Sequence, residues 1–110
     1  MNVSFNGFGE NILTFEFQGD LSVGDPVMIV SSGTVQKASG KFCGICTGVR
    51  NGYASVQVSG YARASYTTAP AVGYSKISAE NGKINADSSN GREYLVIDTD
   101  SSEKTFGLIL

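Results

Sequence analysis

Apolar and polar residues alternate on both sides of Asn51-Gly52, near the middle of the chain. Asn-Gly between two such runs is the strongest short-range signal for a two-residue hairpin, because both turn residues must accept a positive φ. Pairing outward from the turn gives one almost wholly apolar face, made by Val49, Thr47, Ile45 and Cys43 opposite Ala54, Val56, Val58 and Gly60. The other face is mixed. The pattern therefore predicts a half-buried antiparallel ribbon over residues 42–61, with its register fixed by burial.

Short alternating runs separated by turn residues fill the rest of the chain. In residues 11–18, large apolar residues alternate with polar ones, a period of two that predicts a strand. Further hairpins are predicted around Gly33 and Asn81-Gly82, and a last strand pair over 94–97 and 105–110. No amphipathic helix of useful length is predicted. The chain is therefore expected to be all-β, a small antiparallel sandwich or barrel built of short hairpins.

Two glycine-containing motifs recur 49 residues further along the chain. They are Val23-Gly24 and Gly33-Thr34-Val35, which return as Val72-Gly73 and Gly82-Lys83-Ile84. This spacing suggests a single β domain over 19–110 with pseudo-repeats over 20–66 and 70–110. Glycine turns also recur by chance in β proteins, so duplication and coincidence both remain open. Residues 1–18 lie outside the apparent repeat, and we expect them to form an N-terminal strand or arm that contacts a neighbouring subunit.

The composition narrows the classes of function. The chain has 110 residues with 41% hydrophobic content, which is typical of one globular domain. Its net charge is −2 and its 8 basic residues are scattered singly, so no nucleic-acid groove is expected. No apolar run approaches the roughly 18 residues of a membrane span, and no signal peptide is expected at Met1. Two cysteines are too few for a disulfide-stapled scaffold, which favours cytoplasmic synthesis with reduced thiols.

No catalytic, cofactor or metal motif is expected. Cys43 and Cys46 have CxxC spacing, but the chain lacks the further cysteines or histidines that zinc would need. A strand puts the two thiols on opposite faces, and we expect Cys43 to be buried and Cys46 to lie on the mixed face. The carboxylates between Asp98 and Glu103 are interpreted as a solvated turn rather than a calcium loop. A histidine-free chain without a paired nucleophile and base is not expected to be an enzyme.

Aromatic residues and arginines provide candidates for an interface. These residue types are enriched at binding hot spots, although a second buried layer and its rim would contain the same types. The candidate interface residues are Leu13, Phe15, Phe17, Arg50, Tyr53, Tyr61, Arg63 and Tyr66.

The order of these segments resembles the head decoration, or capsid cement, proteins of tailed bacteriophages. The resemblance is carried by Gly24-Asp25-Pro26-Val27-Met28-Ile29-Val30, the turn at Gly33, Cys43-Gly44-Ile45-Cys46, and Ala54-Ser55-Val56-Gln57-Val58-Ser59-Gly60-Tyr61. A second glycine-apolar unit over 73–84 and an apolar terminal strand over 106–110 complete it. The match covers residues 20–110 and consists of glycine and valine placements. Residues 1–18 depart from the pattern, since relatives often begin with a looser arm.

The resemblance implies a non-enzymatic structural protein that binds and stabilises the outer surface of the capsid. Its partner would be the major capsid protein, and it would form a homo-oligomer, with a trimer favoured. It would be made in the cytoplasm of the bacterial host and located on the virion. Two alternatives stay open at this point: a β module that binds carbohydrate or another ligand, and a subunit of another phage structure such as the tail or baseplate.

Overall fold

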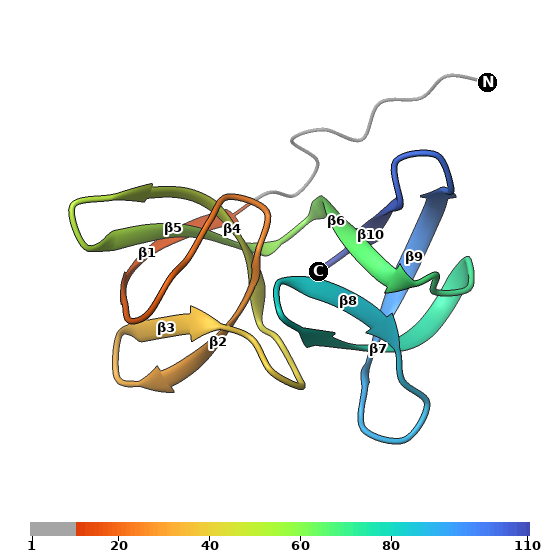
Figure 1. Cartoon of the computed structure of the whole chain (residues 1–110), viewed down its shortest axis with the longest axis horizontal. Helices are drawn as coiled ribbons and strands as arrows, with labels where there is room; N and C mark the ends of the chain where they lie inside the picture. The colour runs from red at the N-terminus through yellow and green to blue at the C-terminus, as the bar shows by residue number, and fades with distance from the viewer. Residues whose placement is uncertain (1–10) are drawn as a thin grey trace.

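The computed structural model describes residues 11–110, whose regular structure is entirely β (Figure 1). The strands are β1 (Asn11–Phe17), β2 (Pro26–Ser31), β3 (Thr34–Lys37), β4 (Gly44–Arg50), β5 (Tyr53–Ser59), β6 (Tyr61–Thr68), β7 (Gly73–Glu80), β8 (Lys83–Ala86), β9 (Arg92–Asp100) and β10 (Thr105–Ile109). The prediction of an all-β chain of short hairpins is confirmed.

The strands form two closed barrels of five strands each, which lie side by side (Figure 1). The first has the order β1-β3-β2-β4-β5 and the second the order β10-β6-β8-β7-β9. Strand β1 pairs parallel with β3, and β6 pairs parallel with β8. Every other neighbouring pair is antiparallel. Each strand of the first barrel therefore corresponds to the strand five places later in the chain, and the two barrels share one topology.

The limits of the two structural units differ from the expected ones. Strand β1 belongs to the first barrel, because Phe15 pairs with Ala54 of β5 and Phe17 with Val35 of β3. The units therefore run over 11–59 and 61–109, and removing residues 1–18 would take a strand out of a closed barrel. The turns that reveal the repeat in sequence lie inside each unit, so they do not mark where it begins. The rest of the expected arm, residues 1–10, lies outside the described residues.

The central hairpin has the predicted turn, but its register changes after three residue pairs. Asn51 and Gly52 both have positive φ, 48° and 81°, as a two-residue turn of this kind requires. A bulge at Thr47 then makes this residue extra, so that Cys46 rather than Thr47 lies opposite Val56. From Cys46 back to Gly44, each residue of β4 therefore faces the side opposite to the predicted one. The expected burial of the two thiols was wrong: Cys46 is 1% exposed, whereas Cys43 is only partly buried.

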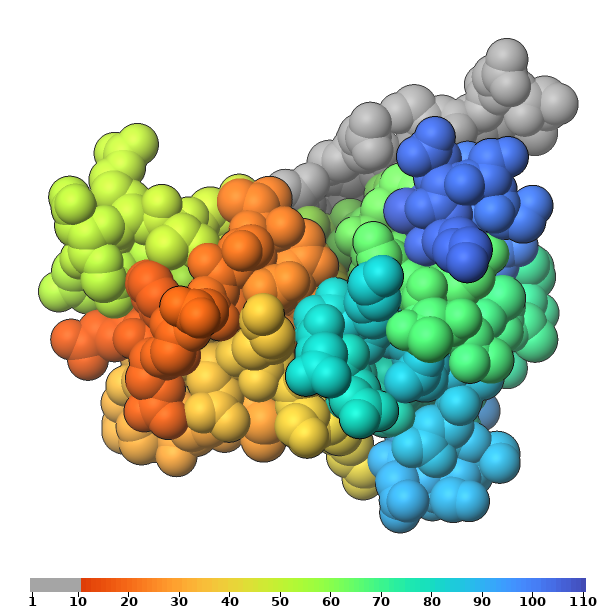
Figure 2. All heavy atoms as spheres, viewed as in Figure 1, coloured from red at the N-terminus to blue at the C-terminus, as the bar shows by residue number. Residues whose placement is uncertain are grey.

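A shared hydrophobic core joins the two barrels. The interior of the second barrel continues into Ala38, Phe42 and Ile45 of the first unit. The ring of Phe42 stacks on Tyr94 of β9 with 5.0 Å between centroids, and the Tyr94 hydroxyl donates a 2.7 Å hydrogen bond to the Phe42 carbonyl. In Figure 2 the yellow atoms of the β3–β4 connection accordingly lie against the cyan atoms of β7 and β8. The barrels therefore form one packed body.

Two glycines of β4 test how tightly the first barrel is packed. A Cβ on Gly44 would overlap the carbonyl oxygen of Gln57 and lie 2.7 Å from Val56 Cγ1, whereas one on Gly48 would meet no atom closer than 4.0 Å. We expect Gly44→Ala to lower the free energy of unfolding by about 1–3 kcal/mol, because the backbone of β5 must move. Gly48→Ala is the matched control and should change it by less than about 0.5 kcal/mol. Urea unfolding of both variants checks this, and equal stabilities would contradict the packing of β4 on β5.

Candidate binding surface

The outer face of strands β4, β5 and β1 consists of two rows of residues that lie directly opposite one another. One row is Gly48, Ser55 and Thr14, and the next row towards the hairpin turn is Arg50, Tyr53 and Glu16. Residues directly opposite in an antiparallel sheet point to the same side. A row of small residues therefore lies beside a row of long ones.

A pocket of about 630 Å³ lies over the row of small residues. It is lined by Thr14, Gly48, Val49, Arg50, Asn51, Tyr53 and Ser55. Gly48 has no side chain, and Ser55 and Thr14 have short ones. The longer side chains of Arg50 and Tyr53, in the next row, line the side of the pocket. Both are exposed, and no carboxylate of residues 11–110 lies within 4.0 Å of the Arg50 guanidinium. The pocket thus combines an unpaired cation, an aromatic ring and two hydroxyls.

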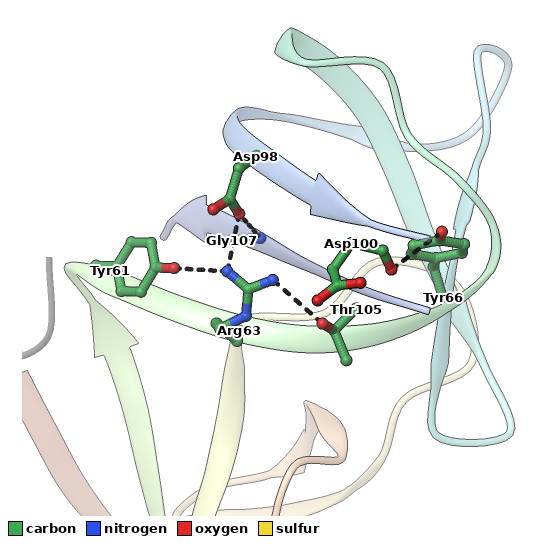
Figure 3. A network of polar contacts seen from close by, with 7 residues as sticks. All are labelled: Tyr61, Arg63, Tyr66, Asp98, Asp100, Thr105 and Gly107. Atoms are coloured by element: carbon green, nitrogen blue, oxygen red, sulfur yellow. Dashed lines mark hydrogen bonds and ion pairs between the residues drawn. The ribbon is translucent and has the colours of Figure 1, made fainter. Parts of the chain in front are cut away.

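The equivalent face of the second barrel is closed by its own side chains (Figure 3). Arg63 Nη1 lies 2.8 Å from Asp98 Oδ1 and donates a 2.8 Å hydrogen bond to the Tyr61 hydroxyl, while Nη2 donates to Thr105 Oγ1 at 3.1 Å. The backbone N–H of Gly107 donates to the same Asp98 oxygen at 3.1 Å. The ion pair therefore spans β10 above Gly107.

Glycine at position 107 is needed for this arrangement. A Cβ there would lie 2.6 Å from the Tyr61 hydroxyl and 2.8 Å from Asp98 Oδ1. Partial burial lowers the pKa of Arg63, but its hydrogen bonds to Tyr61 and Asp98 outweigh this effect and raise the pKa overall. The guanidinium is held as a cation in a network that occupies the whole row.

Matching the two barrels strand by strand relates the pocket to this network. The pairs of β1 with β5 and of β6 with β10 equate Thr14 with Arg63 and Ser55 with Gly107. The pairs of β4 with β5 and of β9 with β10 equate Gly48 with Asp98. The same face is thus built twice: an ion pair covers it in the second barrel, and it is open in the first.

In the neighbouring row, the residue on β4 and its counterpart on β9 carry opposite charges. Arg50 of the first barrel corresponds to Asp100 of the second. The Asp100 carboxylate accepts hydrogen bonds from the backbone N–H groups of Ser102 (3.0 Å) and Glu103 (3.2 Å), so it organises the β9–β10 turn. Within residues 11–110, Arg50 makes no comparable hydrogen bond or ion pair.

The candidate interface residues fall into three environments. Arg50 and Tyr53 line the pocket, while Tyr61 and Arg63 belong to the network of the second barrel. Tyr61 and Tyr66 are each only 8% exposed. On β1, Leu13 is 51% exposed, whereas Phe15 and Phe17 pack against the core of the first barrel.

The small residues of the pocket floor were not among the candidates. Thr14, Gly48 and Ser55 carry no chemical signal of their own, because what matters at these positions is the absence of bulk. The internal repeat is a signal for Thr14 alone, since the 49-residue spacing places it on Arg63; Gly48 and Ser55 match Asp98 and Gly107 only through the strand pairing.

The two cysteine thiols lie in environments that disfavour the thiolate. Cys43 and Cys46 are both free, and burial raises the pKa of each thiol, which keeps it protonated and weakly nucleophilic. No group of three or more potential metal ligands occurs within residues 11–110. The described residues also contain no helix of the length and apolarity needed to cross a membrane.

Comparisons with known proteins returned no relatives. No protein-family model matches the sequence, and no curated protein or solved structure shows significant similarity to the chain.

The ion pair above Gly107 makes a measurable prediction. In a double-mutant cycle with Arg63→Met and Asp98→Asn, we expect a coupling free energy of about 0.5–1 kcal/mol, because the two side chains are 37% and 57% exposed and solvent screens part of their attraction. The free energies of unfolding of the four proteins in urea give this value, which should fall as salt is added. A coupling of zero at low salt would mean that the pair does not contribute to closing this face.

Proposed function

We propose that this protein is a non-enzymatic structural protein that binds and stabilises the outer surface of a tailed-phage capsid, with the major capsid protein as its partner. The observation that carries the proposal is the pair of fused barrels with a common core. This body presents the same kinds of surface twice along one chain. Such a chain is suited to contacting two neighbouring copies of a repeated subunit at once.

The closed barrels favour attachment through side chains. Closing a sheet removes the free strand edges through which β proteins add strands from other chains. A decoration protein accumulates in many copies, so protection from edge-to-edge aggregation before it reaches the shell suits this role. The expected location is the virion surface after synthesis in the host cytoplasm, as a homo-oligomer with a trimer favoured by the resemblance.

Exposed apolar residues at equivalent loops supply contacts of the required kind. Val23, in the β1–β2 connection, is 67% exposed, and its counterpart Val72, in the β6–β7 connection, is 63% exposed. Tyr74, close to the second loop, is 74% exposed. Two similar weak contacts on one rigid chain reinforce each other, because binding of the first raises the effective concentration of the second.

A second candidate, a carbohydrate-binding module, is favoured by the pocket itself. Tyr53 offers a ring on which a sugar could stack, with the hydroxyls of Thr14 and Ser55 beside it. Tyr61 and Tyr66 are buried and do not offer such a ring. Binding of the purified protein to a glycan array, with loss of binding on Tyr53→Ala, would favour this candidate over the capsid.

Capsid binding is tested by adding the purified protein to undecorated heads and measuring occupancy by co-sedimentation and electron microscopy. We expect saturable binding, and at least about tenfold weaker binding for the double variant Val23→Asp/Val72→Asp, because each valine loses its apolar contact and introduces a charge that must be desolvated. Ser88→Asp, at an exposed position of the β8–β9 connection, is the charge control and should bind like the wild type. Failure of the wild-type protein to bind any head preparation would overturn the proposal.

A further inference from the structure

The two versions of one barrel face differ in a way that indicates what fits the pocket. In the second barrel, Asp98 supplies a carboxylate at the edge of the row, and the chain's own Arg63 and Gly107 N–H bind it. In the first barrel the corresponding position is Gly48, where a side chain would have open space. The position at which the second barrel holds a carboxylate is therefore empty in the first.

The charge around the empty position suits the missing group. Arg50 stands beside it on β4 with no ion-pair partner in residues 11–110, and Asn51, Ser55 and Thr14 add polar groups along the lining. Glu16 is the acidic residue of the neighbouring row, and Tyr53 separates it from Arg50. An incoming carboxylate that approaches from the β4 side would meet Arg50 first and Glu16 last.

The size and lining of the pocket indicate a side chain on a protein loop rather than a free ion. A carboxylate group alone would fill only a small part of about 630 Å³. The ring of Tyr53 adds apolar surface that fits the methylene groups of an acidic side chain. Guanidinium and carboxylate form a two-pronged hydrogen-bonded pair, so the contact would also orient the loop.

We propose that this pocket receives an aspartate or glutamate side chain from a loop of the capsid subunit, which pairs with Arg50. Arg50 lies in the row next to the position equivalent to Arg63, so the chemistry of the second-barrel ion pair is repeated with a differently placed arginine. The inference rests on the proposed function and adds the chemistry of the contact. In the second barrel, the ion pair on this face forms within the chain. In the first barrel, the capsid subunit would supply the carboxylate.

The test grafts the closed face of the second barrel onto the first. The triple variant Thr14→Arg/Gly48→Asp/Ser55→Gly places the arginine, carboxylate and glycine of the second barrel at the equivalent positions and leaves the net charge unchanged. Arg50→Gln removes only the cation. Lys83→Gln, at the exposed first position of β8, is the matched control for loss of one positive charge. Circular dichroism and urea unfolding confirm that each variant is folded before binding to undecorated heads is measured.

We expect the triple variant and Arg50→Gln each to bind at least about tenfold more weakly than the wild type, and Lys83→Gln to bind equally well. Salt should weaken wild-type binding more steeply than that of Arg50→Gln. A reconstruction of decorated heads should show an acidic side chain of the shell within about 4 Å of the Arg50 guanidinium.

Two outcomes separate this inference from the proposed function. If the wild type binds heads and both pocket variants bind them as tightly, the pocket contact is wrong while capsid binding stands. If the wild type binds no heads, the proposed function fails and the contact fails with it. A sugar, or a neutral or basic side chain, seated against Arg50 would likewise overturn the acidic contact.

Discussion

The packing of Phe42 against Tyr94 is the contact on which the rest of the molecule depends. Each barrel is built from about 50 residues, a size at which a chain buries too little apolar surface to be more than marginally stable alone. The first unit extends Ala38, Phe42 and Ile45 into the interior of the second, and this enlarges one continuous core. The hydrogen bond from the Tyr94 hydroxyl to the Phe42 carbonyl fixes the direction of approach. The two barrels therefore stabilise each other as parts of one body.

The two barrels present equivalent sheet faces, and these faces carry different side chains: an ion pair in the second barrel and a pocket in the first. In the second, the glycine is central at position 107, and long charged side chains on either side meet above it. In the first, the glycine is at the edge, at position 48, and the neighbouring residues are a serine and a threonine. Three differences in side chain separate a face covered by its own ion pair from an open one, while the strand pairing is the same in both. The pocket is thus a property of the pair of faces.

Much of the fold could be predicted because its turns use residues with a strong local preference. Asn51-Gly52 and Asn81-Gly82 both adopt the positive φ angles that these residues tolerate best, and they reveal two hairpins. The bulge at Thr47 could not be foreseen, since threonine fits a regular strand equally well, and it reversed the predicted burial of the thiols. The inclusion of β1 in a barrel depends on long-range pairing with β3 and β5. The pocket exists because Gly48, Ser55 and Thr14 are small, and small residues carry no local sequence pattern that predicts a pocket.

The junction between the barrels has a mechanical consequence. Strand β5 ends at Ser59 and β6 begins at Tyr61, with only the buried Gly60 between them, and the Leu110 N–H donates a 2.9 Å hydrogen bond to the Gly60 carbonyl. A connection of one residue has little slack, so the end of β5 and the start of β6 are held close together. A load applied to one barrel passes directly into the other along a continuous backbone, and the last residue of the chain braces the point of transfer.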